Sequence, residues 1–286
     1  MPSLIDIRRR VRSVRNTQQI TKAMKMISAA KLRRAQDRAL AARPYGTILH
    51  QLLANVAAAA SQSPDAGGHP LLAVRPEKKV LMIVVTADRG LAGAFNTNLL
   101  KMAQRFVNEN SDKELMVEAI GRKARDYFRK RGLTLTGEYL DMMKRLSVEY
   151  ADTIAEGVIE RFSQGEVDAV YLFVNEFKSV IAPNLSQTRL LPIEVPQSSA
   201  AVDYIYEQKP EQLLGSLLPK YVKGQIYRAL LESVAAEHAA RMTAMDAASS
   251  NASEMIDTLT LYMNRVRQAT ITREIIEIVS GAAALD

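Results

Sequence analysis

The last twenty residues, RQATITREIIEIVSGAAALD (267–286), contain the pattern that decides the fold. They complete a longer stretch, residues 225–280, that has neither proline nor glycine. At about 1.5 Å per residue, this stretch predicts an unbroken helix of about 84 Å. An ordinary globular domain uses helices of about 11–12 residues. A helix of this length must therefore lie along another helix, enter a partner, or do both.

The first forty residues repeat this character, because residues 3–43 also lack proline and glycine. Ser3 and Asp6 resemble a capping pair at the start of a helix. The apolar residues that follow are spaced three and four apart, as in the seam of a coiled coil: Leu4, Ile7, Val11 and Val14. The seam weakens through Gln18 and Thr21. Pro44 and Gly46 are expected to bend this helix or to end it, and helical character can resume as far as residue 60.

A second candidate seam lies near the C-terminus. Its members step by four and three residues: Met255, Leu259, Tyr262, Val266 and Ala269. Two seams at opposite ends of one chain can pair antiparallel if the middle of the chain folds back as a separate unit.

The middle of the chain is typical of an α/β domain. Continuous apolar runs predict buried strands at residues 80–85, 115–120 and 169–175, with a short strand at 133–136 and an edge strand at 188–193. Helices are expected between them, at residues 91–108, 122–131 and 147–163. This alternation predicts a small parallel sheet with helices on both faces. A loop at residues 61–70 and a linker at 196–201 flank the domain, and the last helical region is expected to start near Pro210.

Composition limits the classes of protein that are possible. Hydrophobic residues make up 48% of the chain and charged residues 24%, as in proteins with an apolar core. The absence of cysteine excludes disulfides and thiolate metal sites and fits a reducing compartment. No apolar run is long enough for a transmembrane helix, and the start MPSLIDIRRR does not resemble a secretory signal.

The net charge of +7 is unevenly distributed. Residues 1–43 carry about +10, residues 44–224 are close to neutral, and residues 225–286 carry about −3. A basic helix could bind nucleic acid, and this remains an alternative. Against it, the basic residues are not interleaved with aromatic ones, and no nucleic-acid module follows. The apolar seam instead indicates a partner helix, with the arginines facing an acidic protein wall.

The segment TADRGLAGAFN (86–96) stands where a strand passes into a helix, which is where a phosphate-binding loop would lie. Its glycines, Gly90 and Gly93, do not match the spacing of either common phosphate-binding motif. We therefore favour a tight turn with a helix cap over a ligand site. Asp88 and Arg89 are then expected to be local pairing groups or subunit contacts.

Other catalytic and cofactor signals are weak. The three histidines (His50, His69 and His238) are scattered, and EHAAR around His238 is not the HExxH zinc motif. We expect no metal, no cofactor and no catalytic residue, although a small-molecule enzyme built on the α/β middle remains a second alternative. The apolar end IIEIVSGAAAL is unusual, since exposed chain ends tend to be polar. Either it packs on the chain's own N-terminal helix, or it inserts into a ring of other subunits.

Four segments together resemble one family: IRRRVRSVRNTQQITKAMKMISAAKLRRAQ, TADRGLAGAFN, DYIYEQKP and RQATITREIIEIVSGAAA. The chain is similar, over essentially its whole length, to the gamma subunits of F-type ATP synthases. The last segment is the diagnostic one, with Ile271, Thr272, Glu274, Glu277, Gly281 and Ala282 at the family positions.

This resemblance implies a rotor shaft. Residues 1–60 and 207–286 would form a long antiparallel coiled coil inside the hexamer of alpha and beta subunits. Residues 76–196 would form a small Rossmann-like α/β foot on the c-ring, beside the epsilon subunit. Proton-driven rotation of the ring would turn the shaft and drive the catalytic beta subunits through their states. The gamma subunit itself would bind no nucleotide, no nucleic acid and no cofactor.

The resemblance also implies roles for residues at matching positions. Contacts with the beta subunit and transmission of torque are expected from Met24, Lys25, Arg33, Arg34, Arg267, Gln268 and Thr270. Tyr204 and Glu207 match positions that touch the c-ring, and Asp88 and Arg89 lie in the foot loop on the epsilon side. Lys25 departs from the family, since many relatives carry an acidic residue there. The chain also lacks the cysteine-bearing insertion of chloroplast forms, which argues against thiol regulation. Its start does not resemble a transit segment, so we expect a peripheral position at the cytoplasmic face of a bacterial inner membrane, with membrane contact only through the c-ring.

Overall fold

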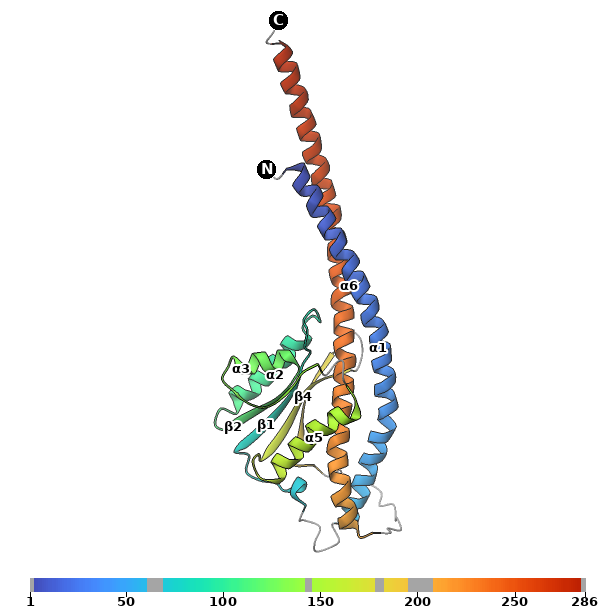
Figure 1. Cartoon of the computed structure of the whole chain (residues 1–286), viewed down its shortest axis with the longest axis vertical. Helices are drawn as coiled ribbons and strands as arrows, with labels where there is room; N and C mark the ends of the chain where they lie inside the picture. The colour runs from blue at the N-terminus through green and yellow to red at the C-terminus, as the bar shows by residue number, and fades with distance from the viewer. Residues whose placement is uncertain (1–2, 61–68, 142–145, 178–182, 195–207, 284–286) are drawn as a thin grey trace. The chain divides into compact units, whose positions relative to one another are not determined.

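The computed structural model describes residues 3–60, 69–141, 146–177, 183–194 and 208–283. The chain divides into two compact units. The helical unit consists of Met1–Ser28 together with Met242–Asp286, and the α/β unit consists of Ala29–Arg241. Two long helices, α1 and α6, contribute to both units (Figure 1).

Helix α1 spans Leu4–Ala60, 57 residues in one element. Its start has the capping pair expected from the sequence. The Oγ of Ser3 accepts from the backbone N–H of Asp6 at 3.2 Å, and the Asp6 carboxylate accepts from the backbone N–H of Ser3 at 3.3 Å and from its hydroxyl at 2.7 Å. These reciprocal bonds satisfy backbone donors that would otherwise be free at a helix start. The pKa of Asp6 is lowered, mainly by its hydrogen bond from the Ser3 side chain.

Pro44 lies inside α1 and does not end it. Of the two alternatives, an end of the helix near residue 44 is therefore wrong, and the continuation to Ala60 is confirmed. A proline in a helix removes one backbone hydrogen bond to the carbonyl four residues earlier, here that of Leu40. Both Pro44 and Leu40 are exposed, so water can satisfy this carbonyl.

Within the helical unit, the N-terminal seam continues further than its apolar residues suggest. Ile7 is buried, and Val11 and Val14 are half-buried, as expected. The same three-four spacing continues through Gln18, which is half-buried, and Thr21, which is buried. Polar residues thus replace apolar ones in the seam without breaking its period.

The C-terminal seam on α6 differs from the expected one. Met255 and Tyr262 are 46% and 41% exposed, and Ala269 is exposed as well. The buried or half-buried positions of this stretch instead step by four and three through Ala252, Ile256, Leu259, Met263 and Val266. Both stripes contain Leu259 and Val266, so apolar character alone did not distinguish them. Small Ala252 is buried at 8% exposure, where a larger side chain would need more room between the helices.

Helix α6 spans Pro210–Ala283, 74 residues, and starts where the sequence indicated. In the α/β unit it runs antiparallel to α1. The rings of His50 and Tyr221 have centroids 6.2 Å apart, and a Cβ placed on Gly224 would lie 3.7 Å from the Leu49 side chain. The two helices are therefore in side-chain contact at this point, and a Cβ on Gly224 would fit in ordinary van der Waals contact.

The α/β unit holds a five-stranded sheet with the strand order β3-β2-β1-β4-β5. The strands are β1 (Lys79–Val85), β2 (Glu114–Ile120), β3 (Thr134–Tyr139), β4 (Ala169–Phe177) and β5 (Pro183–Leu191). The first four pair in parallel, and β5 pairs antiparallel with β4 at the edge. The expected edge strand is confirmed, but the sheet is mixed and not wholly parallel. A parallel neighbour would need a long crossover, whereas β5 returns directly after β4.

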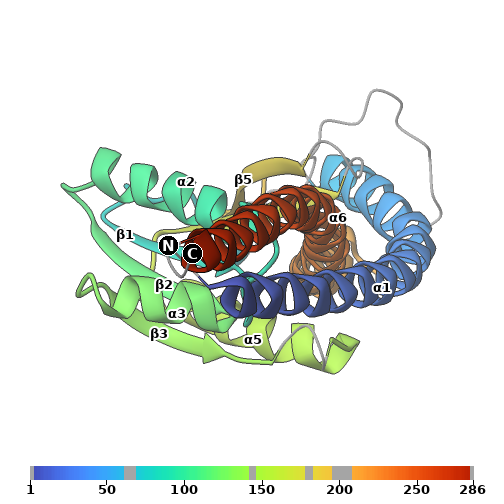
Figure 2. The ribbon, with the colours of Figure 1, turned by 90° about the horizontal axis from the view of Figure 1, so that it is seen from above.

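Helices cover both faces of this sheet, as predicted. They are α2 (Phe95–Glu109), α3 (Arg122–Arg129) and α5 (Val148–Ser163), and η1 (Pro70–Leu72) is a short 3-10 turn before β1. Because crossovers are right-handed, α2 and α3 lie on one face, and α5, which crosses in the other direction, lies on the opposite face (Figure 2). On the α2 face, Met82 and Phe173 of the sheet pack with Leu99 and Phe128 of the helices.

Helix α2 begins at Phe95, four residues later than expected. The residues between β1 and Phe95 form a structured loop instead of a first helical turn. This loop is the TADRG segment, and its contacts are those of a candidate site.

Candidate interaction surfaces

The loop after β1 uses its polar side chains to hold the start of α3. The Oγ1 of Thr86 accepts from the backbone N–H of Ala124 at 2.8 Å. Oδ1 of Asp88 accepts from the backbone N–H of Arg122 at 3.1 Å and from that of Asp141 at 3.2 Å. A carboxylate at this end of a helix satisfies a free donor and interacts favourably with the helix dipole. Asp88 is therefore a local pairing group, one of the two roles that the sequence allowed.

The same loop packs too closely against Gly121 for any other residue there. Gly121 has φ of 92°, and a Cβ on it would lie 2.1 Å from the Thr86 carbonyl oxygen. On the other side of the loop, Asn96 accepts from the backbone N–H of Ala87 at 2.9 Å. The side chains of Thr86, Asp88 and Asn96 therefore hydrogen-bond backbone N–H groups of the chain, as expected of a turn and cap.

Helix α6 holds the tip of this loop through a buried ion pair that the sequence did not reveal. Glu237 is 1% exposed and pairs with Arg241, one helical turn later. The Arg241 guanidinium also donates to the backbone carbonyl of Gly90 at 3.3 Å. His238 lies beside this pair, with Nδ1 2.8 Å from a Glu237 carboxylate oxygen. An i, i+4 spacing of Glu and Arg was visible in EHAAR, but its burial was not.

Met24 and Lys25 belong to the helical unit. Met24 is half-buried. The Nζ of Lys25 lies 2.6 Å from Oδ1 of Asp246 on α6, and the two side chains are 42% and 60% exposed. The unusual lysine thus has an acidic partner within its own chain. Such exposed pairs contribute little to stability, on the order of 0–1 kcal/mol.

The end of α6 is exposed from Arg267 to Gly281. Arg267, Gln268 and Thr270 are all exposed, and so is each residue of the stretch 267–281. Five large apolar side chains there are between 47% and 72% exposed: Ile271, Ile275, Ile276, Ile278 and Val279. The alternative in which this end packs on the chain's own N-terminal helix is therefore wrong for the described residues.

Arg33 and Arg34 are exposed on α1, within the α/β unit. Arg34 lines a groove of about 410 Å³ that has a basic rim and an apolar floor. The groove residues are Lys31, Arg34, Ala35, Arg38, Leu146, Leu231, Val234 and His238. This arrangement suits an anionic partner surface. Tyr204 and Glu207, the expected c-ring contacts, lie outside the described residues.

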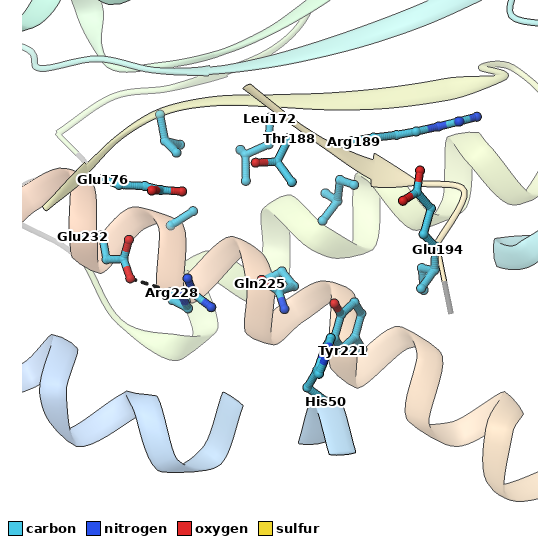
Figure 3. Close-up of a pocket in the computed structure, with 14 residues that line it drawn as sticks. His50, Leu172, Glu176, Thr188, Arg189, Glu194, Tyr221, Gln225, Arg228 and Glu232 are labelled. Carbon is cyan, nitrogen blue, oxygen red and sulfur yellow. Dashed lines mark hydrogen bonds and ion pairs between the residues drawn. The ribbon is translucent and has the colours of Figure 1, made fainter. Parts of the chain in front are cut away.

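A second cavity of the α/β unit, of about 390 Å³, lies between α6 and strands β4 and β5 (Figure 3). Four of its charged groups have partners within the chain. Nε of Arg228 lies 3.1 Å from Oε1 of Glu232, and Glu176 accepts a hydrogen bond from Asn184 at 2.9 Å. The Arg189 side chain extends away from this pair in Figure 3 and bonds Glu77 at 3.2 Å. The groups do not converge on a point where a reacting atom could sit.

The described part of the chain carries neither a metal-binding cluster nor a membrane-spanning helix. There, His, Asp and Glu side chains nowhere form a group of three or more that could hold a metal ion. Among the described helices, none has the length and apolar character needed to cross a bilayer.

Comparison with known proteins identifies the family of this chain. The family model described as ATP synthase matches residues 3–285. The ATP synthase gamma chain of Solibacter usitatus is 62% identical over 286 residues, with the whole of both chains covered. That of an Anaeromyxobacter species is 51% identical over 290 residues, again with both chains fully covered. The chain belongs to the ATP synthase gamma chain family. As a gamma chain it is a non-catalytic subunit of its ATP synthase.

Solved structures of more distant proteins share this fold. A chain from the central stalk and c-ring of the Tetrahymena thermophila mitochondrial ATP synthase has a TM-score of 0.63 at 23% identity, covering 80% of this chain and 99% of its own. A rotor chain of the Euglena gracilis mitochondrial enzyme has a TM-score of 0.65 at 19% identity, covering 94% of this chain and 98% of its own. These likenesses establish the fold: paired long helices with a central α/β domain.

Proposed function

We propose that this gamma chain is the turning shaft of its ATP synthase and couples proton-driven rotation of a c-ring to the catalytic cycle of the beta subunits. The proposal rests on the bare end of α6, by which we mean its exposed residues 267–281. Residues 267–281 are exposed, and five of their large apolar side chains receive no cover from the described chain. A row of exposed apolar side chains marks a surface that partners cover, here by proposal the hexamer of alpha and beta chains.

Torque would be transmitted by residues of both units. In the helical unit these are Met24, Lys25, Arg267, Gln268 and Thr270. In the α/β unit, Arg33 and Arg34 would meet acidic loops of the beta subunits, supported by their exposure and by the basic groove beside Arg34. Rotation past three equivalent partners favours such shallow contacts, because deep anchors would resist each step.

The α/β part would form the foot. Residues 76–196 would rest on the c-ring beside the epsilon subunit, with Tyr204 and Glu207 touching ring loops, while residues 1–60 and 207–286 would form the shaft. The Tetrahymena and Euglena structures hold such chains together with a c-ring and with F1, which supports this assembly. The chain would be held peripherally at the cytoplasmic face of a bacterial inner membrane, with membrane contact only through the ring.

Reconstitution tests this function. The chain would be combined with its cognate alpha and beta subunits, and a probe on the α/β unit would be followed during ATP hydrolysis. We expect stepwise rotation in one direction with three main dwells. Assembly without rotation would leave gamma as a scaffold and overturn the shaft function. Failure to assemble would also reject it. Retained DNA binding in physiological salt would then favour the nucleic-acid alternative.

A further inference from the structure

The basic groove of the α/β unit, the cavity of about 410 Å³ beside Arg34, has three positive side chains along one wall. They are Lys31, Arg34 and Arg38 of α1, which are three and four residues apart and therefore share one face of the helix. Within the described part of the chain, none of these three side chains has an ion-pair or hydrogen-bond partner. The described lining residues include no Asp or Glu. Neighbouring like charges repel each other, so the groove favours an anion.

The floor of the groove is aliphatic. Leu231 and Val234 of α6 are buried there, and Leu146, just before α5, is half-buried. Ala35 of α1 also lines the groove, and its small side chain leaves room between the helices. The lining positions on each helix extend over seven residues, which is about 10 Å along the axis. A groove of this length and volume suits a small ligand with an elongated apolar body.

His238 adds a buried polar group to the wall of the groove. It is 8% exposed, and its Nδ1 lies 2.8 Å from a carboxylate oxygen of Glu237 without the geometry of a hydrogen bond. Glu237 is paired with Arg241 instead. Buried polar side chains are normally hydrogen-bonded, and an exception that lines a cavity is a candidate partner for a ligand.

We infer that the basic groove binds the anion of a fatty acid of medium chain length. Its carboxylate would pair with Arg34 and Arg38, because planar guanidinium groups bind carboxylates through paired hydrogen bonds. Its alkyl chain would lie on Leu231 and Val234. Arg34 is also proposed to meet the beta subunits, so this ligand would compete with that contact. The binding itself needs no other subunit, and its test is therefore independent of the proposed function.

Isothermal titration calorimetry of the isolated full-length chain tests the groove with three probes. Octanoate carries both the carboxylate and the chain, inorganic phosphate is an anion without a chain, and octanol has the chain without the charge. We expect octanoate to bind at least about tenfold more tightly than either of the others, because each of them lacks one of the two contacts. Phosphate or octanol binding as tightly as octanoate would overturn the inference.

Charge variants locate the carboxylate. Arg34→Gln and Arg38→Gln should each weaken octanoate binding about tenfold, because a charge-assisted hydrogen bond is lost. Arg43→Gln removes the same charge from α1 outside the groove and should bind like wild type. Ile276→Asn alters the exposed apolar end of α6 and should also bind like wild type. Wild-type binding by both groove variants, or loss of binding in Ile276→Asn, would overturn the site.

Chain length locates the alkyl group. In wild type, octanoate should bind at least about tenfold more tightly than butanoate, because its additional methylene groups are buried. Leu146→Asn makes the floor polar and should reduce this gain severalfold. An equal gain in both chains would show that the alkyl group does not touch the floor. Arg34 and Arg38 are exposed, so their variants should melt within about 2 °C of wild type, which separates lost binding from lost folding.

Discussion

The hydroxyl oxygens of Thr21 on α1 and Ser249 on α6 lie 2.7 Å apart between the two long helices. Both residues are buried, at 8% and 6% exposure. Each hydroxyl also lies within hydrogen-bond distance of a carbonyl of its own helix, that of Gln18 at 3.0 Å and that of Met245 at 2.8 Å. A polar layer of this kind in an apolar seam can fix the register of a helix pair.

A double-mutant cycle on this layer should show coupling. Thr21→Val and Ser249→Ala should each lower the free energy of unfolding of the full chain by about 1 kcal/mol, because one hydroxyl loses its partner. The double variant should lose less than the sum of the two single losses. Denaturant unfolding measures all four chains. Strict additivity would mean that the two hydroxyls do not interact in solution.

The seam also shows how far apolar spacing predicts packing. Spacing located the N-terminal seam correctly and two members of the C-terminal one, Leu259 and Val266. It failed for Met255 and Tyr262, which are exposed. The observed stripe through Ile256 and Met263 is about as apolar as the expected one. Which of the two stripes is buried depends on how closely the two helices approach. Spacing within one helix does not contain that information.

The TADRG loop illustrates the limit for sites. Glycine spacing favoured a turn and cap, and the loop side chains do cap the start of α3. The partners of Asp88 are the backbone N–H groups of Arg122 and Asp141, 34 and 53 residues away along the chain. Likewise, Arg241 reaches Gly90 across 151 residues. Such contacts follow from strand order, which local patterns do not determine.

Asp88 should stabilise the α/β unit as a helix cap. Asp88→Ala should lower the free energy of unfolding by about 1 kcal/mol, the usual cost of losing an N-terminal cap. Asp88→Asn should lose less, because its amide oxygen can still accept from the N–H groups of Arg122 and Asp141. Thermal unfolding of the full chain measures both. Asp112→Ala, at an exposed turn, should change stability by less than about 0.5 kcal/mol and is the control.

Glu118 should make stability depend on pH. It is fully buried in β2 and accepts a hydrogen bond from the Tyr139 hydroxyl at 3.0 Å. Burial raises the pKa of Glu118 above its ordinary value of 4.5. Above that value the folded chain holds this proton more tightly than the unfolded chain does. The contribution to stability is therefore complete in acid and is lost as pH rises through the folded pKa.

Glu118→Gln removes this titration and nearly preserves the shape of the side chain. Denaturant unfolding between about pH 5 and pH 8 should show wild type losing stability relative to the variant as pH rises. Glu109→Gln, at an exposed position near the end of α2, should follow the wild-type curve. Parallel curves for Glu118→Gln and wild type would show that the carboxyl group titrates alike in the folded and unfolded chains.

Gln268 is exposed on the bare end of α6. Its substitution should therefore affect assembly and coupling in the complex but not the stability of the isolated chain. Gln268→Leu should leave the unfolding of isolated gamma unchanged within about 0.5 kcal/mol, as is usual for exposed positions. In the complex it should impair assembly or the coupling of ATP hydrolysis to proton pumping. Gln164→Leu, at an exposed position after α5, is the control and should couple normally. Normal turnover and pumping by Gln268→Leu would remove this residue from the torque surface.

Removal of the bare end should leave the folding of the isolated chain intact. A chain ending at Val266 loses the exposed stretch 267–281, whose side chains are not buried in the described chain. Its Tm should match that of the full chain within about 2 °C, because a transition of this size shifts by about 2–4 °C per kcal/mol. A much larger drop would mean that this end packs on its own chain in solution. Five exposed apolar side chains leave with it, so the shortened chain should also self-associate less in sedimentation experiments.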